Sequence, residues 1–203
     1  MCVIIYKPAG VKISDAILRS CMIANNHGAG FAFRANNKIV AKKGFFNLRT
    51  LKVAIGKYDS CEGVVHFRLR SAGLISGKFC HPFKIDSRYL FHNGHIPKLG
   101  TQKTSDTYKL AQILKRLSYN DQIELLEDLE LRGDGRFALV GSQGVDLIGE
   151  FQAYEGLFFS NLHWLYGKPV KVPKGDDYFM NCPKCHSKAI WNKVMCSQCG
   201  HWF

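Results

Sequence analysis

The chain has 203 residues, of which 46% are hydrophobic and 22% charged, and this composition excludes a disordered or collagen-like protein. No apolar run approaches the roughly 18 residues of a membrane-spanning helix, so no membrane association is expected. The first residues lack the basic start and long apolar stretch of a secretory signal, which predicts a cytoplasmic protein. Its formal net charge is +12.

Short segments rich in Val, Ile, Phe and Tyr, bounded by Gly, Asn or Asp, predict β-strands. In chain order they cover residues 3–6, 30–34, 38–42, 63–68, 89–92, 136–141, 145–149 and 156–160. Helical spacing of apolar residues predicts helices at 14–23, 106–117 and 120–131, the second of them capped by Ser105. Strands dominate both halves and helices are grouped between them, so we expect a layered α+β domain.

Four of the eight cysteines form two C-x-x-C pairs near the end of the sequence, separated by ten residues as in a zinc ribbon. The predicted ligands are Cys182, Cys185, Cys196 and Cys199. Four thiolates close a tetrahedral shell, so we expect a structural Zn²⁺ that supplies most of this short module's folding free energy. A segment rich in Pro and Gly precedes the module, which predicts domains at residues 1–175 and 176–203.

The positive net charge leaves two interpretations open. Lys and Arg number 28 against 16 Asp and Glu, and they are spread along the chain rather than clustered. An excess of this size favours a polyanionic partner such as nucleic acid, a nucleotide or a phosphorylated substrate. An even spread is equally typical of a solvated surface.

Further motifs follow one another through residues 2–161. The first three are Cys2 with the apolar strand after it, the Gly-rich segment 26–32, and the segment 66–73, which begins with His-Phe-Arg. The next three are His-Pro-Phe at 81–83, the segment 91–96, which contains His-Asn-Gly, and Ser-Asp-Thr at 105–107. Residues 136–140 and 158–161 add two later strands. Each motif alone has an ordinary explanation, such as a hairpin turn at Asn-Gly. In this order the chain resembles the class II glutamine amidotransferase domain.

The resemblance implies a four-layer αββα sandwich of the N-terminal-nucleophile hydrolase type and an enzyme that releases ammonia from glutamine. Its nucleophile would be Cys2, exposed as the first residue once Met1 is removed. The α-amine of Cys2, with an ordinary pKa of about 7.7–8.0, then suits the role of general base. The family's Asn-Gly element stabilises the oxyanion, which assigns that role to Asn93 and Gly94.

Glutamine needs partners for its own carboxylate and ammonium groups. The resemblance implies that Arg68 pairs with the carboxylate, a bidentate task that Lys performs poorly. It implies that Asp106 binds the ammonium, and it places Ser71 among the substrate-binding residues. Arg70 and His95 depart from the family's pattern without removing a catalytic group.

No segment after residue 161 looks large enough for the acceptor domain that usually accompanies this family's catalytic domain. We therefore expect ammonia to pass to a separate acceptor enzyme. The alternative is a non-catalytic module of the same fold that binds nucleic acid or a protein through its basic surface and zinc ribbon. Retention of the whole set of site residues favours the enzyme, because a binding module does not need them.

Overall fold

The computed structural model describes residues 1–165, 179–181 and 188–190. The chain divides into two compact units, Met1–Asn161 and Leu162–Phe203. In the second unit, strands β11 (Phe179–Asn181) and β12 (Lys188–Ile190) pair antiparallel. The predicted domain boundary at residue 175 and the four predicted zinc ligands lie outside the described residues.

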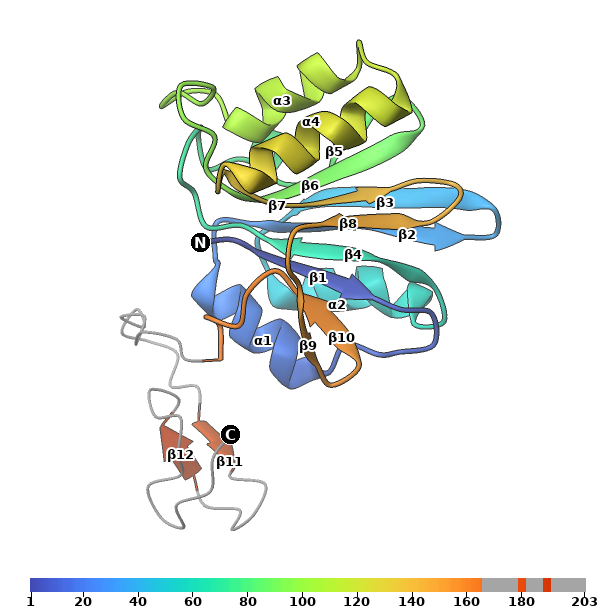
Figure 1. The fold of residues 1–203 in the computed structure, drawn as a ribbon. Helices are drawn as coiled ribbons and strands as arrows, with labels where there is room; N and C mark the ends of the chain where they lie inside the picture. The colour runs from blue at the N-terminus through green and yellow to red at the C-terminus, as the bar shows by residue number, and fades with distance from the viewer. Residues whose placement is uncertain (166–178, 182–187, 191–203) are drawn as a thin grey trace. The chain divides into compact units, whose positions relative to one another are not determined.

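A six-stranded antiparallel sheet forms one half of the first unit (Figure 1). Its strands, in spatial order, are β3 (Lys38–Phe45), β2 (Ala29–Ala35), β4 (Glu62–Phe67), β1 (Val3–Lys7), β10 (Leu157–Phe159) and β9 (Gln152–Tyr154). β1 is a central strand, with Ile4 opposite His66 on β4 and Ile5 opposite Phe159 on β10. The start of the chain is therefore held between two neighbouring strands.

A four-stranded antiparallel sheet faces the first sheet. It consists, in order, of β5 (Phe83–Ile85), β6 (Arg88–Gly94), β7 (Gly135–Val140) and β8 (Val145–Ile148). The two sheets meet through buried apolar side chains. These are Ile4, Ala32 and Val64 on one sheet and Phe91, Ala138 and Val140 on the other. This packing brings β1 close to β6, although eighty residues of sequence, 8–87, separate them.

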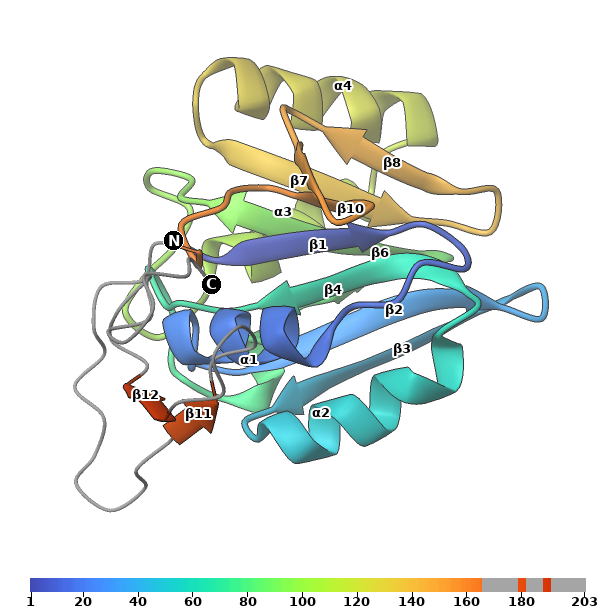
Figure 2. The same ribbon diagram turned by 90° about the horizontal axis from the view of Figure 1, so that it is seen from below.

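Helices cover the outer faces of both sheets (Figure 1). α3 (Asp106–Leu114) and α4 (Tyr119–Leu131) bury Leu110, Leu114 and Leu126 in a core shared with the four-stranded sheet. α1 (Asp15–Ala24) and α2 (Leu48–Ile55) lie over the six-stranded sheet, in front of it in Figure 2. Two short 3₁₀ helices, η1 (Gly56–Tyr58) and η2 (Gly77–Phe79), complete the described elements.

The two antiparallel sheets and four α-helices of the first unit are compatible with the expected α+β class. Each predicted strand overlaps an observed strand. No helix among the described residues combines the length and apolar character needed to cross a bilayer.

The helices differ from the prediction in two places. α3 ends at Leu114 instead of residue 117, because the N–H groups of Arg116 and Leu117 bond three residues back and tighten the last turn. α2 was not predicted, since it buries only Leu51 and Ile55 and its apolar pattern is short. Its start is explained by the Asn47 side chain, which accepts from two backbone N–H groups.

Candidate active site

One narrow pocket gathers side chains from well-separated segments of the first unit. It contains five of the six predicted catalytic and substrate-binding residues. These are Cys2, Arg68, Ser71, Gly94 and Asp106. The empty volume is about 240 Å³, but only about 10 Å³ admits the centre of a water-sized molecule. The sheet topology explains the convergence, because the pocket lies where the start of β1 meets the ends of β4 and β6.

Cys2 lies directly before β1, and its thiol faces the segment that follows β4. The Leu69 N–H donates to the Cys2 sulfur over 3.3 Å, and the thiol donates back to the Leu69 carbonyl oxygen, also at 3.3 Å. Burial raises the pKa of the Cys2 thiol, while the Leu69 N–H, the positive chain terminus and Arg68 act to lower it. Because burial is the largest effect, the thiol stays protonated at neutral pH and needs a base to attack.

Arg68 follows β4 and is 3% exposed. Its guanidinium donates to the carbonyl oxygens of Ala72 at 2.8 Å and Leu74 at 2.9 Å. These two bonds use the planar fork that a carboxylate would otherwise occupy. Arg68 therefore has the position and the geometry to bind a carboxylate, but it is engaged by the loop that follows it.

Asp106 begins α3, where the helix dipole favours a negative charge. One carboxylate oxygen accepts from the Thr107 N–H at 2.8 Å, and the other accepts from the Ile96 N–H at 3.1 Å. His95, a position that departs from the family's pattern, places its Nδ1 3.7 Å from the second oxygen and is 57% exposed. The predicted cap by Ser105 is wrong in detail, because the Ser105 side chain makes no capping bond.

Asn93 and Gly94 end β6, beside the pocket. Gly94 lines it, and a Cβ at this position would overlap the carbonyl oxygen of Asp134, so the close approach of β6 and β7 requires glycine. Asn93 is 2% exposed and is not among the residues that line the pocket. Its amide nitrogen donates to Ser160 Oγ at 2.9 Å. The structure thus places Asn93 next to the pocket without turning its N–H groups into it.

Three buried histidines next to the reactive residues received no role from the sequence. His81 and His92 line the pocket, and the rings of His66 and His81 lie 3.9 Å apart. Burial lowers the pKa of His66 to about 3 and also lowers the pKa values of His81 and His92. All three rings are therefore neutral near pH 7. Their sequence signal was that each stands inside one of the family-like motifs.

Because the His92 ring is neutral, only one of its two nitrogens carries a hydrogen, and the contacts show which one. Nε2 lies 3.1 Å from the Asp134 carbonyl oxygen, which can only accept, so Nε2 carries the hydrogen. Nδ1 then accepts from the Thr107 hydroxyl at 2.9 Å. Through these two bonds His92 ties the end of β6 to the first turn of α3, next to Asp106. The histidine therefore helps to hold the Asp106 carboxylate in register with the strand that ends in Gly94.

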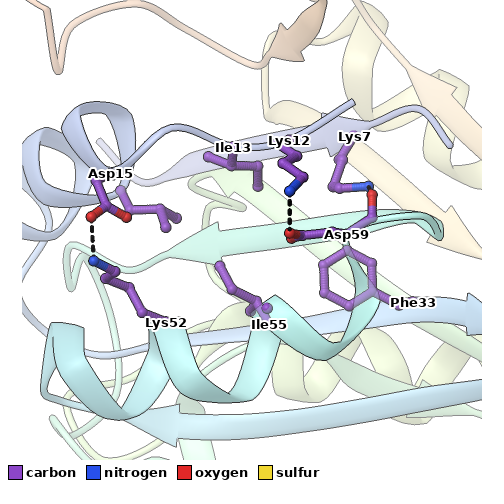
Figure 3. A pocket seen from close by; sticks show the side chains of 10 residues that line it. Lys7, Lys12, Ile13, Asp15, Phe33, Lys52, Ile55 and Asp59 are labelled. Carbon is purple, nitrogen blue, oxygen red and sulfur yellow. Dashed lines mark hydrogen bonds and ion pairs between the residues drawn. The ribbon is translucent and has the colours of Figure 1, made fainter. Parts of the chain in front are cut away.

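A larger cavity lies between α1, α2 and the six-stranded sheet (Figure 3), and about 250 Å³ of it admits the centre of a water-sized molecule. Lys12 pairs with Asp59 at 3.3 Å and Lys52 pairs with Asp15. The Lys7 ammonium donates to three backbone carbonyl oxygens, so its hydrogens already have acceptors. No cysteine, serine, threonine or histidine lines this cavity. None of the six predicted catalytic and substrate-binding residues lines it.

Among the described residues no group of three or more His, Cys, Asp or Glu side chains is arranged to hold a metal ion. The predicted zinc ligands are outside this part of the chain, so the zinc site stays a prediction resting on its four thiolates.

Comparisons with known proteins identify a fold and no close relative. No family model matches the chain, and no curated protein matches it. Among solved structures, glutamine phosphoribosylpyrophosphate amidotransferase from B. subtilis, complexed with ADP and GMP, is similar with a TM-score of 0.50 and 17% sequence identity. The similarity covers 78% of this chain and 41% of that one, so this chain spans less than half of its neighbour's length. The likeness supports a distant relation in fold.

Proposed function

We propose that this chain is a glutamine amidotransferase or glutaminase of the N-terminal-nucleophile type, with Cys2 as the nucleophile. The observation that carries the proposal is the pocket. It places a half-buried thiol, a guanidinium and a carboxylate around one small space, from segments up to about a hundred residues apart. A thiol suits attack on an amide, and a cation and an anion in one pocket suit a free amino acid.

The reaction begins when removal of Met1 frees the α-amine of Cys2. That amine accepts the thiol proton as the sulfur bonds to the side-chain amide carbon of glutamine. The oxyanion that forms accepts hydrogen bonds from Asn93 and the Gly94 N–H. The carbon–nitrogen bond then breaks, and the proton held by the amine leaves with ammonia. Water hydrolyses the remaining thioester and releases glutamate.

Substrate recognition uses the two charged side chains that line the pocket together with Cys2. Arg68 pairs with the α-carboxylate of glutamine, and Asp106 pairs with the α-ammonium. Ser71 lies in the loop directly after Arg68 and adds a hydroxyl to the same pocket. The pocket is narrow as it stands, and the Arg68 guanidinium is bonded to Ala72 and Leu74. Binding therefore requires residues 70–76 to move and release the guanidinium.

Ammonia released in this pocket would serve a separate acceptor enzyme, and the C-terminal module would hold a structural Zn²⁺ through its four cysteines. Both statements rest on the sequence.

Intact mass measurement and an ammonia assay test the proposal together. We expect the mass of the chain without Met1, glutamine-dependent ammonia release, and covalent labelling of Cys2 by a glutamine analogue that carries an electrophile. Cys2→Ala should abolish turnover and labelling. Cys61→Ala is the matched control, because Cys61 is another half-buried free cysteine, outside the pocket, and should leave both unchanged.

A processed chain that neither releases ammonia nor is labelled at Cys2 would refute the enzyme. The binding module would then remain, and a salt-dependent affinity for nucleic acid would be the measurement to make.

A further inference from the structure

Ser160 connects the strand that follows the nucleophile to the strand that carries the oxyanion residues. It directly follows β10 and is 2% exposed. Its Oγ accepts from the Ile4 N–H at 2.9 Å and from Asn93 Nδ2 at 2.9 Å. Its own N–H donates to the Ile4 carbonyl oxygen at 3.0 Å. One hydroxyl thus joins β1 of the six-stranded sheet to β6 of the four-stranded sheet, two residues from Cys2.

Only one of the two polar atoms of the Asn93 amide has a hydrogen-bond partner at this junction. Nδ2 is used by Ser160, while the buried Oδ1 has no hydrogen-bond partner among the described residues. A buried acceptor without a partner costs about 1–3 kcal/mol. A half-turn of the amide about its last torsion exchanges the two atoms with almost no change of shape. Oδ1 then accepts the Ser160 hydroxyl hydrogen, and Nδ2 takes the place of the unpaired oxygen.

The hydroxyl of Ser160 suits both orientations, because a hydroxyl donates as well as accepts. In the turned orientation it still accepts from the Ile4 N–H and now donates to Asn93. The N–H groups of Asn93 are then available to a negatively charged oxygen that develops beside Cys2. A side chain without a polar atom, such as that of Ala, could support neither orientation.

We propose that Ser160 is a positioning residue for the oxyanion site, holding the Asn93 amide at a set place relative to Cys2 and supporting its turn toward the developing charge. The assignment rests on the proposed function. A neighbouring contact acts in the same direction, because Asn161 Nδ2 donates to the Cys2 carbonyl oxygen at 2.7 Å. Ser160 and Asn161 therefore hold the positions of two groups of the proposed site, the oxyanion donor Asn93 and the nucleophile Cys2.

Loss of Ser160 should lower kcat for glutamine much more than it changes KM. Contacts to the oxyanion exist in the transition state and not in the bound substrate, so their loss lowers kcat and leaves KM nearly unchanged. Removing an oxyanion donor outright costs about 10²–10³ in rate. Ser160→Ala leaves Asn93 in place but unanchored, so we expect kcat to fall about tenfold to a hundredfold.

A double-mutant cycle separates positioning from general damage. Ser160→Ala, Asn93→Ala and the double variant are compared for kcat and KM with glutamine. Ser160→Thr tests rescue by a retained hydroxyl, and Ser142→Ala, an exposed serine in the turn after β7, is the matched control. We expect the double variant to be no slower than Asn93→Ala, since Ser160 acts through Asn93. Alkylation of Cys2 by iodoacetamide, which needs no oxyanion site, should proceed at the wild-type rate in Ser160→Ala.

Three results would overturn the assignment: wild-type kcat in Ser160→Ala, losses that multiply in the double variant, or alkylation of Cys2 slowed as much as turnover. If Ser160→Ala does not fold, Ser160→Thr decides, because its hydroxyl should retain most of the wild-type kcat. A wild-type chain without glutamine turnover would overturn the proposed function, and this assignment with it. An active wild type with an unaffected Ser160→Ala would overturn only the assignment.

Discussion

Replacing Arg68 by Lys tests the substrate-binding role of the pocket most directly. The change keeps the positive charge and removes the planar fork. Arg68 is buried and already demonstrates two-pronged donation, to Ala72 O at 2.8 Å and Leu74 O at 2.9 Å. A Lys ammonium is a point charge that cannot reproduce both parallel bonds to one carboxylate. The variant should therefore bind glutamine through one strong bond instead of two.

The size of the effect follows from that lost bond. A hydrogen bond to a charged group contributes about 1.5–3 kcal/mol, so loss of one weakens glutamine binding by about 2 kcal/mol. That corresponds to a rise of roughly 30-fold in KM. The reacting amide does not contact Arg68 in the proposed reaction, so kcat should change much less. The loop carbonyl that loses its donor lies near the surface, so we expect the melting temperature to fall by only about 2–4 °C.

Steady-state ammonia release over a range of glutamine concentrations measures both constants, and calorimetry checks the fold. Arg70→Lys is the matched control, because Arg70 is exposed two residues away and does not line the pocket. It should behave as wild type. A variant Arg68→Lys with unchanged KM and a reduced kcat would refute the carboxylate-binding role. Equal slowing of Cys2 alkylation by an uncharged reagent would do the same, since it would show a disturbed nucleophile.

Four further outcomes are expected. Asp106→Asn should raise KM for glutamine at least tenfold in the same assay, because the amide cannot pair with the ammonium; an unchanged KM would contradict the assignment. Gly94→Ala should lower the melting temperature and abolish turnover, since its Cβ would overlap the Asp134 carbonyl; a stable, active variant would show that β6 and β7 can separate. The free energy of unfolding should fall on acidification, because the pKa of His66 is about 3 in the folded chain and about 6.5 in the unfolded one. The unfolded chain binds more protons between these values, so stability measured by urea unfolding should fall as the pH drops below 6.5. His66 contributes about 1.4 kcal/mol per pH unit, and His81 and His92, whose pKa values burial also lowers, add to this slope; a rise would contradict the buried neutral rings. Mass spectrometry should find one zinc per chain that Cys182→Ser releases, with glutamine turnover retained because the shell of four thiolates is closed; a metal-free wild type would refute the ribbon.

Local patterns predicted much of the fold because they report burial. A strand such as β4 is recognised by its run of Val and Phe, and a helix such as α4 by apolar residues at helical spacing. Elements with little to bury gave no such signal. α2 buries two residues. β5 and β9 have three residues each and lack a continuous apolar run such as Leu-Phe-Phe, by which the equally short β10 was predicted.

The residues of the candidate site were predicted from the sequence alone, because Cys2, Arg68, Gly94 and Asp106 stand in an ordered series of motifs. The contacts of those residues became visible in the folded chain. It showed that Arg68 is held by its own loop and that Asn93 turns its amide nitrogen to Ser160. The Asn93–Ser160 bond joins residues 67 positions apart across two packed sheets. Periodicity reports which face of an element is buried, whereas the partner on that face depends on how distant strands pack together.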